Sequence, residues 1–116
     1  PLSVDVLVAM SQESFDSYRY DIRDDTVIIV DPDLVKNHDI GRPLYKIQAL
    51  KIAEELGNKI VTNIVMVGAF TSISGLLPFE AMKESVADSV PERFTDLNIQ
   101  AFERGFEAGK NALKKL

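Results

Sequence analysis

The sequence predicts an α/β fold in which helices cover both faces of a mainly parallel sheet. Two short apolar runs rich in β-branched residues, at 4–9 and 26–30, have the length and composition of buried strands. Between them a helix is predicted at 12–20, preceded by Ser11, a preferred N-cap residue. Strand, helix and strand in this order form a βαβ unit with parallel strands. We therefore expect a Rossmann-like, three-layer α/β/α arrangement.

Local signals divide the rest of the chain into further elements. They predict a loop at 34–43, a short third strand at 44–48, and helices at 49–56, at 60–74, from Pro78 and from Pro91. The loop is expected to be exposed, because turn-forming residues dominate it. Gly57 suits a left-handed helix cap, and Asn58 can begin the next helix as an N-cap. The C-terminal half is therefore predicted to be helical.

The predicted helix at 60–74 is apolar on nearly all sides, which is typical of a helix that is buried on most of its surface. Gly68, Ser72 and Gly75 follow at spacings of four and three, so another backbone can approach them closely. They serve either tight packing within the chain or a subunit interface, and Gly75 also suits a helix end. Asn63 either hydrogen-bonds across an interface or faces a ligand, because a buried amide needs partners.

Composition argues against several classes of function. The net charge of −5 and a pI near 4.8 give no basic surface for nucleic acid. The longest apolar tract, 60–77, is interrupted by polar residues and is shorter than the roughly 20 residues that span a bilayer, so we expect no membrane-spanning helix. The start does not have the pattern of a signal peptide, and a cytoplasmic location is expected.

The sequence offers few groups for catalysis. It contains no cysteine, so it cannot supply the thiolates that hold an iron–sulfur cluster. Its one histidine, His38, lies in the polar loop without a second histidine or a cysteine to complete a metal site. Dinucleotide-binding, Walker and nucleophile-elbow motifs are also missing. We expect no catalytic residue and no metal site in this chain.

Two residues at strand ends are candidates for contact with a cofactor. Asp31, followed by Pro32 and Asp33, stands at the carboxyl end of the second strand, where open α/β sheets place ligands. A metal or ribose contact explains this position, and so does ordinary turn chemistry. Ser11 stands at a helix N-terminus, whose free N–H groups can hold a phosphate or carboxylate, although capping alone needs no ligand.

The number of strands is small for a doubly wound sheet. Two or three strands are predicted, whereas such sheets usually have about five or six. The sequence also lacks an initiating Met. We therefore expect residues 1–116 to form a single domain whose N-terminal strands are missing from this sequence. The alternative is a small domain that partner strands complete.

Three stretches carry a resemblance to a known family. They are Val4-Asp5-Val6-Leu7-Val8-Ala9-Met10-Ser11-Gln12-Glu13, then Ile52-Ala53-Glu54-Glu55-Leu56-Gly57-Asn58-Lys59, and finally 63–75. The helix after Pro91 continues the likeness through Ala101-Phe102-Glu103-Arg104-Gly105. Together they resemble the C-terminal part of the gamma subunit, or gamma domain, of pyruvate and 2-oxoacid:ferredoxin oxidoreductases, most of all the 2-oxoglutarate type. The chain departs from that family at its start, where a gamma subunit usually has a strand and a Gly-rich turn.

The resemblance implies a non-catalytic subunit of an enzyme that oxidatively decarboxylates a 2-oxoacid to an acyl-CoA. In such an enzyme the alpha, beta and delta subunits would hold the thiamine diphosphate and the iron–sulfur clusters, and ferredoxin would accept the electrons. No cofactor is expected to bind this chain alone. Its implied contribution is assembly, with a wall of the coenzyme A site as a further option.

Two other functions stay open on the residues alone. A stand-alone Rossmann-like module could sense a nucleotide or coenzyme A at Ser11 and Asp31. Alternatively, the chain could dimerise through the surface of Gly68, Ser72 and Gly75.

Overall fold

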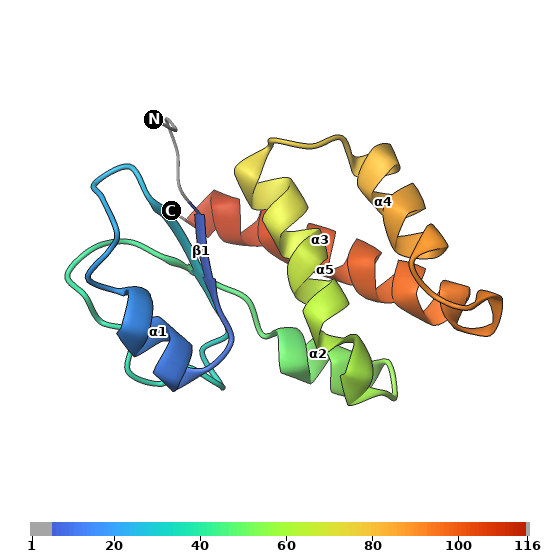
Figure 1. The fold of residues 1–116 in the computed structure, drawn as a ribbon, viewed down its shortest axis with the longest axis horizontal. Coiled ribbons are helices and arrows are strands. Elements are labelled where there is room, and N and C mark those ends of the chain that lie inside the picture. The colour runs from blue at the N-terminus through green and yellow to red at the C-terminus, as the bar shows by residue number, and fades with distance from the viewer. Residues whose placement is uncertain (1–5, 116) are drawn as a thin grey trace.

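A small sheet lies at one end of the molecule and a group of helices at the other (Figure 1). The computed structural model describes residues 6–115. The elements in chain order are β1 (Val6–Ala9), α1 (Gln12–Tyr18), β2 (Val27–Val30), β3 (Tyr45–Lys46), α2 (Ala49–Glu55), the 3₁₀ turn η1 (Lys59–Val61), α3 (Thr62–Ser74), α4 (Phe79–Asp88), the 3₁₀ turn η2 (Glu92–Phe94) and α5 (Thr95–Lys115). The predicted α/β class and the helical C-terminal half are confirmed.

The three strands form a parallel sheet in the order β1-β2-β3. Val6 pairs with Val27 and Ile29 pairs with Tyr45, so the predicted βαβ unit is confirmed. The third strand is shorter than the predicted 44–48, since only two of its residues join the ladder. Positions 4 and 5 of the first predicted strand lie outside the described residues.

Helices cover both faces of the sheet, as the three-layer prediction requires. Successive strand residues point to opposite faces. Ile28 and Val30 therefore pack with Phe15 of α1 on one face, whereas Ile29 and Ile47 pack with the C-terminal helices on the other. Figure 1 shows α1 on one side of the strands and α3 and α5 on the other. Each face has its own apolar core.

The loop at 34–43 is better anchored than its composition predicts. Val35 is completely buried and belongs to the core under α1. Asn37 and Gln12 exchange two hydrogen bonds, each 2.9 Å long, which fasten the loop to α1. Arg42 donates to three backbone carbonyl oxygens in the turn before β2. The expectation of an exposed connection therefore holds for only about half of the loop, because one apolar side chain and two sets of hydrogen bonds hold the rest against the domain.

Caps define the ends of the middle helices, largely as predicted. Gly57 and Gly75 have φ of 91° and 63°, the left-handed conformation that glycine adopts without strain. The Asn58 side chain accepts a hydrogen bond of 3.0 Å from the backbone N–H of Ile60 and so acts as an N-cap. The segment at 60–74 begins as the turn η1 before it becomes α3. Its first residue, Ile60, is 80% exposed, so this end of the apolar segment is not buried as expected.

The helices α3 and α5 cross in direct backbone contact (Figure 1). A Cβ on Gly68 of α3 would overlap the carbonyl oxygen of Phe102, and a Cβ on Gly105 of α5 would overlap that of Val65. Gly109, one turn further along α5, faces α3 in the same way. Glycines normally weaken helices by about 1 kcal/mol each relative to alanine, but here they allow the two helices to approach this closely.

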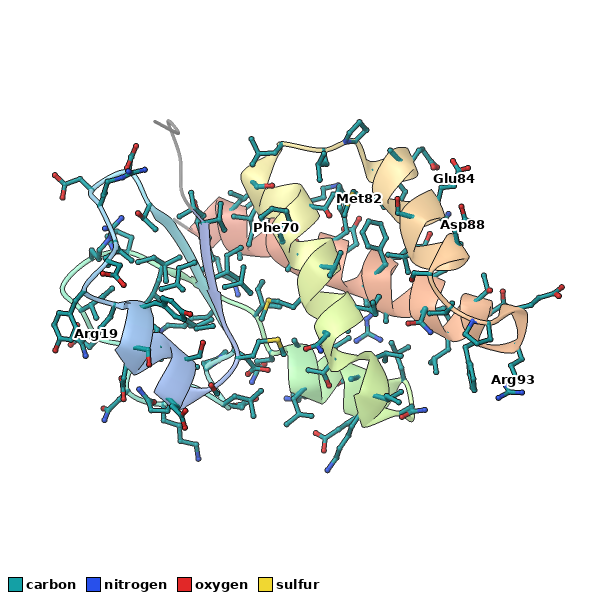
Figure 2. All side chains as sticks on the ribbon, viewed as in Figure 1. Arg19, Phe70, Met82, Glu84, Asp88 and Arg93 are labelled. Carbon is teal, nitrogen blue, oxygen red and sulfur yellow. The ribbon has the colours of Figure 1, made fainter. Side chains whose placement is uncertain are left out.

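An aromatic cluster attaches α4 to the middle of α5. The ring of Phe79 lies 5.5 Å from that of Phe102 and 4.7 Å from that of Phe106, between centroids. Such tilted and edge-on pairs add about 0.5–1.5 kcal/mol beyond the area they bury. Glu84 and Asp88 are exposed on the outer side of α4 (Figure 2). The helix thus turns its apolar side to α5 and its acidic side to solvent.

Adding a methyl group at the crossing should destabilise the protein. We expect Gly105→Ala to lower the free energy of unfolding by roughly 2 kcal/mol or more, because the overlap with a carbonyl outweighs the better helix propensity of alanine. Urea unfolding followed by circular dichroism measures the change. Ser85→Ala, on the exposed side of α4, is the control and should stay within about 0.5 kcal/mol of the parent. Equal stability of the two variants would contradict the proposed packing.

Candidate functional site

The carboxylate of Asp31 lies at the carboxyl end of β2 and is completely buried. One oxygen accepts from the backbone N–H of Asp33 at 3.0 Å, and the other accepts from that of Leu50 at 2.9 Å. Its own backbone N–H donates to the carbonyl of Ala9 at the end of β1. Asp31 therefore connects the ends of two strands to the following loop and to the start of α2.

This arrangement gives Asp31 a structural role. The N-cap residue of α2, Gln48, makes no side-chain hydrogen bond to the first turn, so Asp31 supplies an acceptor that the helix start needs. Both carboxylate oxygens are engaged and no solvent reaches them. Of the two explanations given by the sequence, turn chemistry fits this geometry, and the cofactor contact lacks an accessible oxygen.

Ser11 lies at the same end of the sheet but faces solvent. Its hydroxyl oxygen accepts from the backbone N–H of Ser14 at 3.1 Å, which makes it the predicted N-cap of α1. The helix has only seven residues, so its dipole is small. In addition, the N–H of Ser14 is already satisfied by the Ser11 hydroxyl. Capping accounts for Ser11, and no described neighbour completes a phosphate site.

The four interface candidates do not form one surface. Gly68 is buried under α5, and Ser72 contacts the position of Gly109 on the same helix. Gly75 is exposed and ends α3 in the left-handed conformation. Asn63 is exposed at the opposite end of α3, so its amide needs no buried partner. Of the two uses that the sequence left open for Gly68 and Ser72, the structure shows tight packing within the chain, so these two residues do not present a surface for a dimer.

The described residues contain no group of three or more His, Cys, Asp or Glu that could hold a metal ion. His38 is partly buried in the loop at 34–43. Within residues 6–115, no helix is long and apolar enough to cross a membrane.

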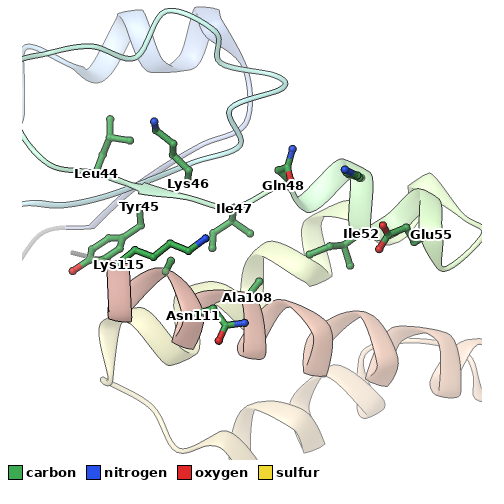
Figure 3. A pocket seen from close by; sticks show the side chains of 12 residues that line it. Leu44, Tyr45, Lys46, Ile47, Gln48, Ile52, Glu55, Ala108, Asn111 and Lys115 are labelled. Carbon is green, nitrogen blue, oxygen red and sulfur yellow. The ribbon is translucent and has the colours of Figure 1, made fainter.

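A groove of about 580 Å³ runs between β3, α2 and the end of α5 (Figure 3). Its walls come from 44–48, from one side of α2, and from the α5 residues Ala108, Asn111, Ala112 and Lys115. This volume lies within the range of ligand pockets, about 300–1,000 Å³. The groove could not be predicted from the sequence, because the two segments that line it, 44–55 and 108–115, are some sixty positions apart and neither contains a recognisable motif.

The groove is lined by more basic than acidic side chains, although the chain as a whole is acidic. Lys46, Lys51 and Lys115 contribute to its walls, while the whole chain has a net charge of −5. Among the described residues that line it, the one carboxylate is Glu55, which pairs with Arg104 on α5. Among the residues that line the groove, no carboxylate is therefore left to pair with the three lysines.

Comparison with known proteins identifies relatives over nearly the whole chain. The family model described as pyruvate ferredoxin/flavodoxin oxidoreductase matches residues 1–108. The 2-oxoglutarate synthase subunit KorC of Methanocaldococcus jannaschii is 40% identical over 110 residues, covering 91% of this chain and 59% of the relative. The indolepyruvate oxidoreductase subunit IorB of Thermococcus kodakarensis is 38% identical over 80 residues, covering 68% of this chain and 40% of the relative.

A solved structure matches the fold closely. The gamma subunit of a keto/oxoacid ferredoxin oxidoreductase from Geobacter sulfurreducens superimposes with a TM-score of 0.87 at 36% identity, covering 92% of this chain and 64% of that one. The chain thus spans about three fifths of the length of the curated relative KorC.

Removing the Asp31 carboxylate should destabilise the fold without any ligand being involved. We expect Asp31→Ala to lower the free energy of unfolding by roughly 2–4 kcal/mol, because two partly buried N–H groups lose the acceptor that the buried carboxylate provides. Asp33→Ala, at an exposed carboxylate, is the matched control and should cost less than about 1 kcal/mol. Urea unfolding of both variants measures the difference, and similar values for the two would show that Asp31 does not join the sheet to α2.

Proposed function

Because the chain belongs to the pyruvate ferredoxin/flavodoxin oxidoreductase family, we propose that it is part of the gamma subunit of a 2-oxoacid:ferredoxin oxidoreductase. Such an enzyme oxidatively decarboxylates a 2-oxoacid to an acyl-CoA. The observation that carries the proposal is the match to a solved gamma subunit, with a TM-score of 0.87 at 36% identity. Agreement in both fold and sequence supports common descent with that subunit, whereas fold alone would not support a function.

In this proposal the chain contributes assembly, and its partners perform the chemistry. It contains no cysteine to bind an iron–sulfur cluster. The two strand-end residues that were candidates for a cofactor, Ser11 and Asp31, are engaged in capping and in connecting elements. Thiamine diphosphate, the iron–sulfur clusters and most contacts to coenzyme A would then belong to alpha, beta and delta subunits, and ferredoxin would accept the electrons. A cytoplasmic location is part of the same proposal.

The relatives favour 2-oxoglutarate as the substrate of the whole enzyme. The KorC subunit at 40% identity comes from a 2-oxoglutarate synthase, and a second KorC, of Methanothermobacter thermautotrophicus, is 37% identical over 113 residues. The indolepyruvate relative matches a shorter part of the chain.

We further propose that the sheet continues beyond β1, as the prediction of missing N-terminal strands requires. Among the described strands β1 pairs only with β2, and its side chains Val6, Leu7, Val8 and Ala9 are all apolar. An unprotected apolar edge strand invites pairing with another strand. The KorC relative is longer than the match by about two fifths of its own length, and such a region would supply the neighbouring strand.

Affinity purification from the native cell tests the subunit assignment. We expect the tagged chain, isolated under anaerobic conditions, to bring with it a thiamine-diphosphate-binding subunit and a cysteine-rich cluster-binding subunit in fixed ratio. Mass spectrometry identifies them, and 2-oxoacid-dependent reduction of ferredoxin by the eluate shows that they are functional. A tagged chain that elutes alone, and that millimolar coenzyme A or ADP stabilises in a thermal-shift assay, would instead support the ligand-sensing module.

Hydrogen exchange tests the continuation of the sheet. The amides of β1 should take up deuterium readily in the isolated chain, because one edge of the strand lacks a partner there. In the complex isolated from the native cell, where the rest of the proposed subunit is present, the same peptide should be protected by about tenfold or more, as expected for a central strand. Exchange of the 27–30 peptide, in the middle of the described sheet, is the internal control. Unchanged exchange of β1 on assembly would refute the continuation.

A further inference from the structure

The strand β3 leaves backbone groups open at the second edge of the sheet. Among the described strands it pairs only with β2. The N–H of Ile47 donates to the carbonyl of Val30 at 2.8 Å, so this residue faces β2. Neighbouring strand residues direct their backbone groups to opposite sides. The N–H and C=O of Lys46 therefore point away from β2, toward the open edge.

The groove follows this open edge and provides an apolar wall beside it. It is lined by 44–48 on the side of the strand, and by Ile52, Ala108 and Ala112 on the side of the helices. The side chains of Ala108 and Ala112 are small, which leaves room for the main chain of a bound peptide next to β3. An edge strand beside an apolar wall is the arrangement that binds extended peptides by adding a strand to the sheet.

Three lysines that line the groove favour a negatively charged ligand. Among residues 6–115, no carboxylate forms an ion pair with Lys46, Lys51 or Lys115. Glu55, on the same wall, is already paired with Arg104. A negatively charged occupant would therefore find unpaired cations, and it would be attracted to this groove although the chain as a whole is acidic.

The cations lie on both faces of the edge strand, which favours a chain over a small ion. Side chains alternate along a strand, so Lys46 points to the face opposite that of Tyr45 and Ile47. Figure 3 shows Lys46 on one side of β3, while Lys115 extends along Tyr45 on the other. One small anion cannot reach both sides of a strand. An added strand presents its own side chains alternately to the two faces and can place a carboxylate on each.

We propose that this groove binds an extended, acidic segment of another subunit of the complex, which adds to β3 as a further strand. The inference rests on the proposed gamma-subunit function and specifies where one partner docks. Main-chain hydrogen bonds to Lys46 give affinity, and carboxylates opposite the three lysines give specificity. A second copy of this chain fits less well, because the other open edge among the described strands, β1, carries only apolar side chains.

Charge reversal in the groove tests the proposal with the assembled complex. The groove variant is Lys46→Glu with Lys51→Glu, and the matched control is Lys36→Glu with Lys114→Glu, which makes the same change of charge at exposed positions outside the groove. Each tagged chain is mixed with the co-purified partner subunits, and its affinity is measured at about 50 and about 300 mM salt. Circular dichroism verifies that both variants fold.

We expect the groove variant to bind its partners at least about tenfold more weakly than the control at low salt, and to lose most of the salt dependence of the parent. A carbodiimide, which joins amines directly to carboxylates, should link Lys46, Lys51 or Lys115 to Asp or Glu of one partner segment. The same reagent should give few links from Lys36.

The other outcomes separate the two proposals. If the parent chain assembles and the groove variant binds as tightly as the control, the docking proposal is wrong and the gamma-subunit function stands. If the parent does not assemble with any oxidoreductase subunit, both are wrong. Nuclear magnetic resonance shifts of the groove lysines on adding inorganic pyrophosphate, together with an absence of cross-links to a partner, would identify a small-anion site and overturn the docking proposal.

Discussion

The backbone contact between α3 and α5 positions most of the molecule. At Gly68 and Gly105 no side chain separates the two helices, so each glycine lies directly against a backbone carbonyl of the other helix. The close approach buries Val65, Ala69 and Ala101 against the face of the sheet that carries Ile29. At this crossing the rings of Phe102 and Phe106 on α5 pack against Phe79 of α4, and beyond it the C-terminal end of α5 reaches β3. The groove exists because this end of α5 stops beside the edge of the sheet.

Asp31 makes the corresponding connection on the side of the sheet. A buried carboxylate is costly unless its oxygens are satisfied, and here backbone N–H groups from the following loop and from α2 satisfy them. The carboxyl end of β2 is thereby fixed to the start of the helical half. In many open α/β sheets this position contacts a ligand, whereas here the fold itself uses it.

The two open edges of the sheet differ in chemistry, and the difference separates two kinds of neighbour. The apolar side chains of β1 suit a strand that becomes part of the same core. The lysines around β3 suit a charged segment that arrives from outside and can be selected by its sequence. The two edges would therefore accept different neighbours, one that extends the apolar core and one that is held by charge. The exposed Ile60, Leu76 and Leu77 on the helical half add scattered apolar surface, which alone identifies no partner.

Local sequence signals determined the βαβ unit, the order of the helices, and the caps at Ser11, Asn58, Gly57 and Gly75, because each depends on residues within a few positions of one another. The absence of cysteine likewise followed from the sequence alone. Only the tertiary structure decided that Gly68 packs against α5, that Asp31 accepts from Leu50, and that Lys46 and Lys115 share one groove. These pairs are separated by nineteen to sixty-nine positions, and a pattern in one segment contains no information about which distant segment it will meet. A small residue, a strand-end carboxylate or an isolated lysine can make many different contacts. Which contact each one makes in this protein depends on how α5 packs across the sheet.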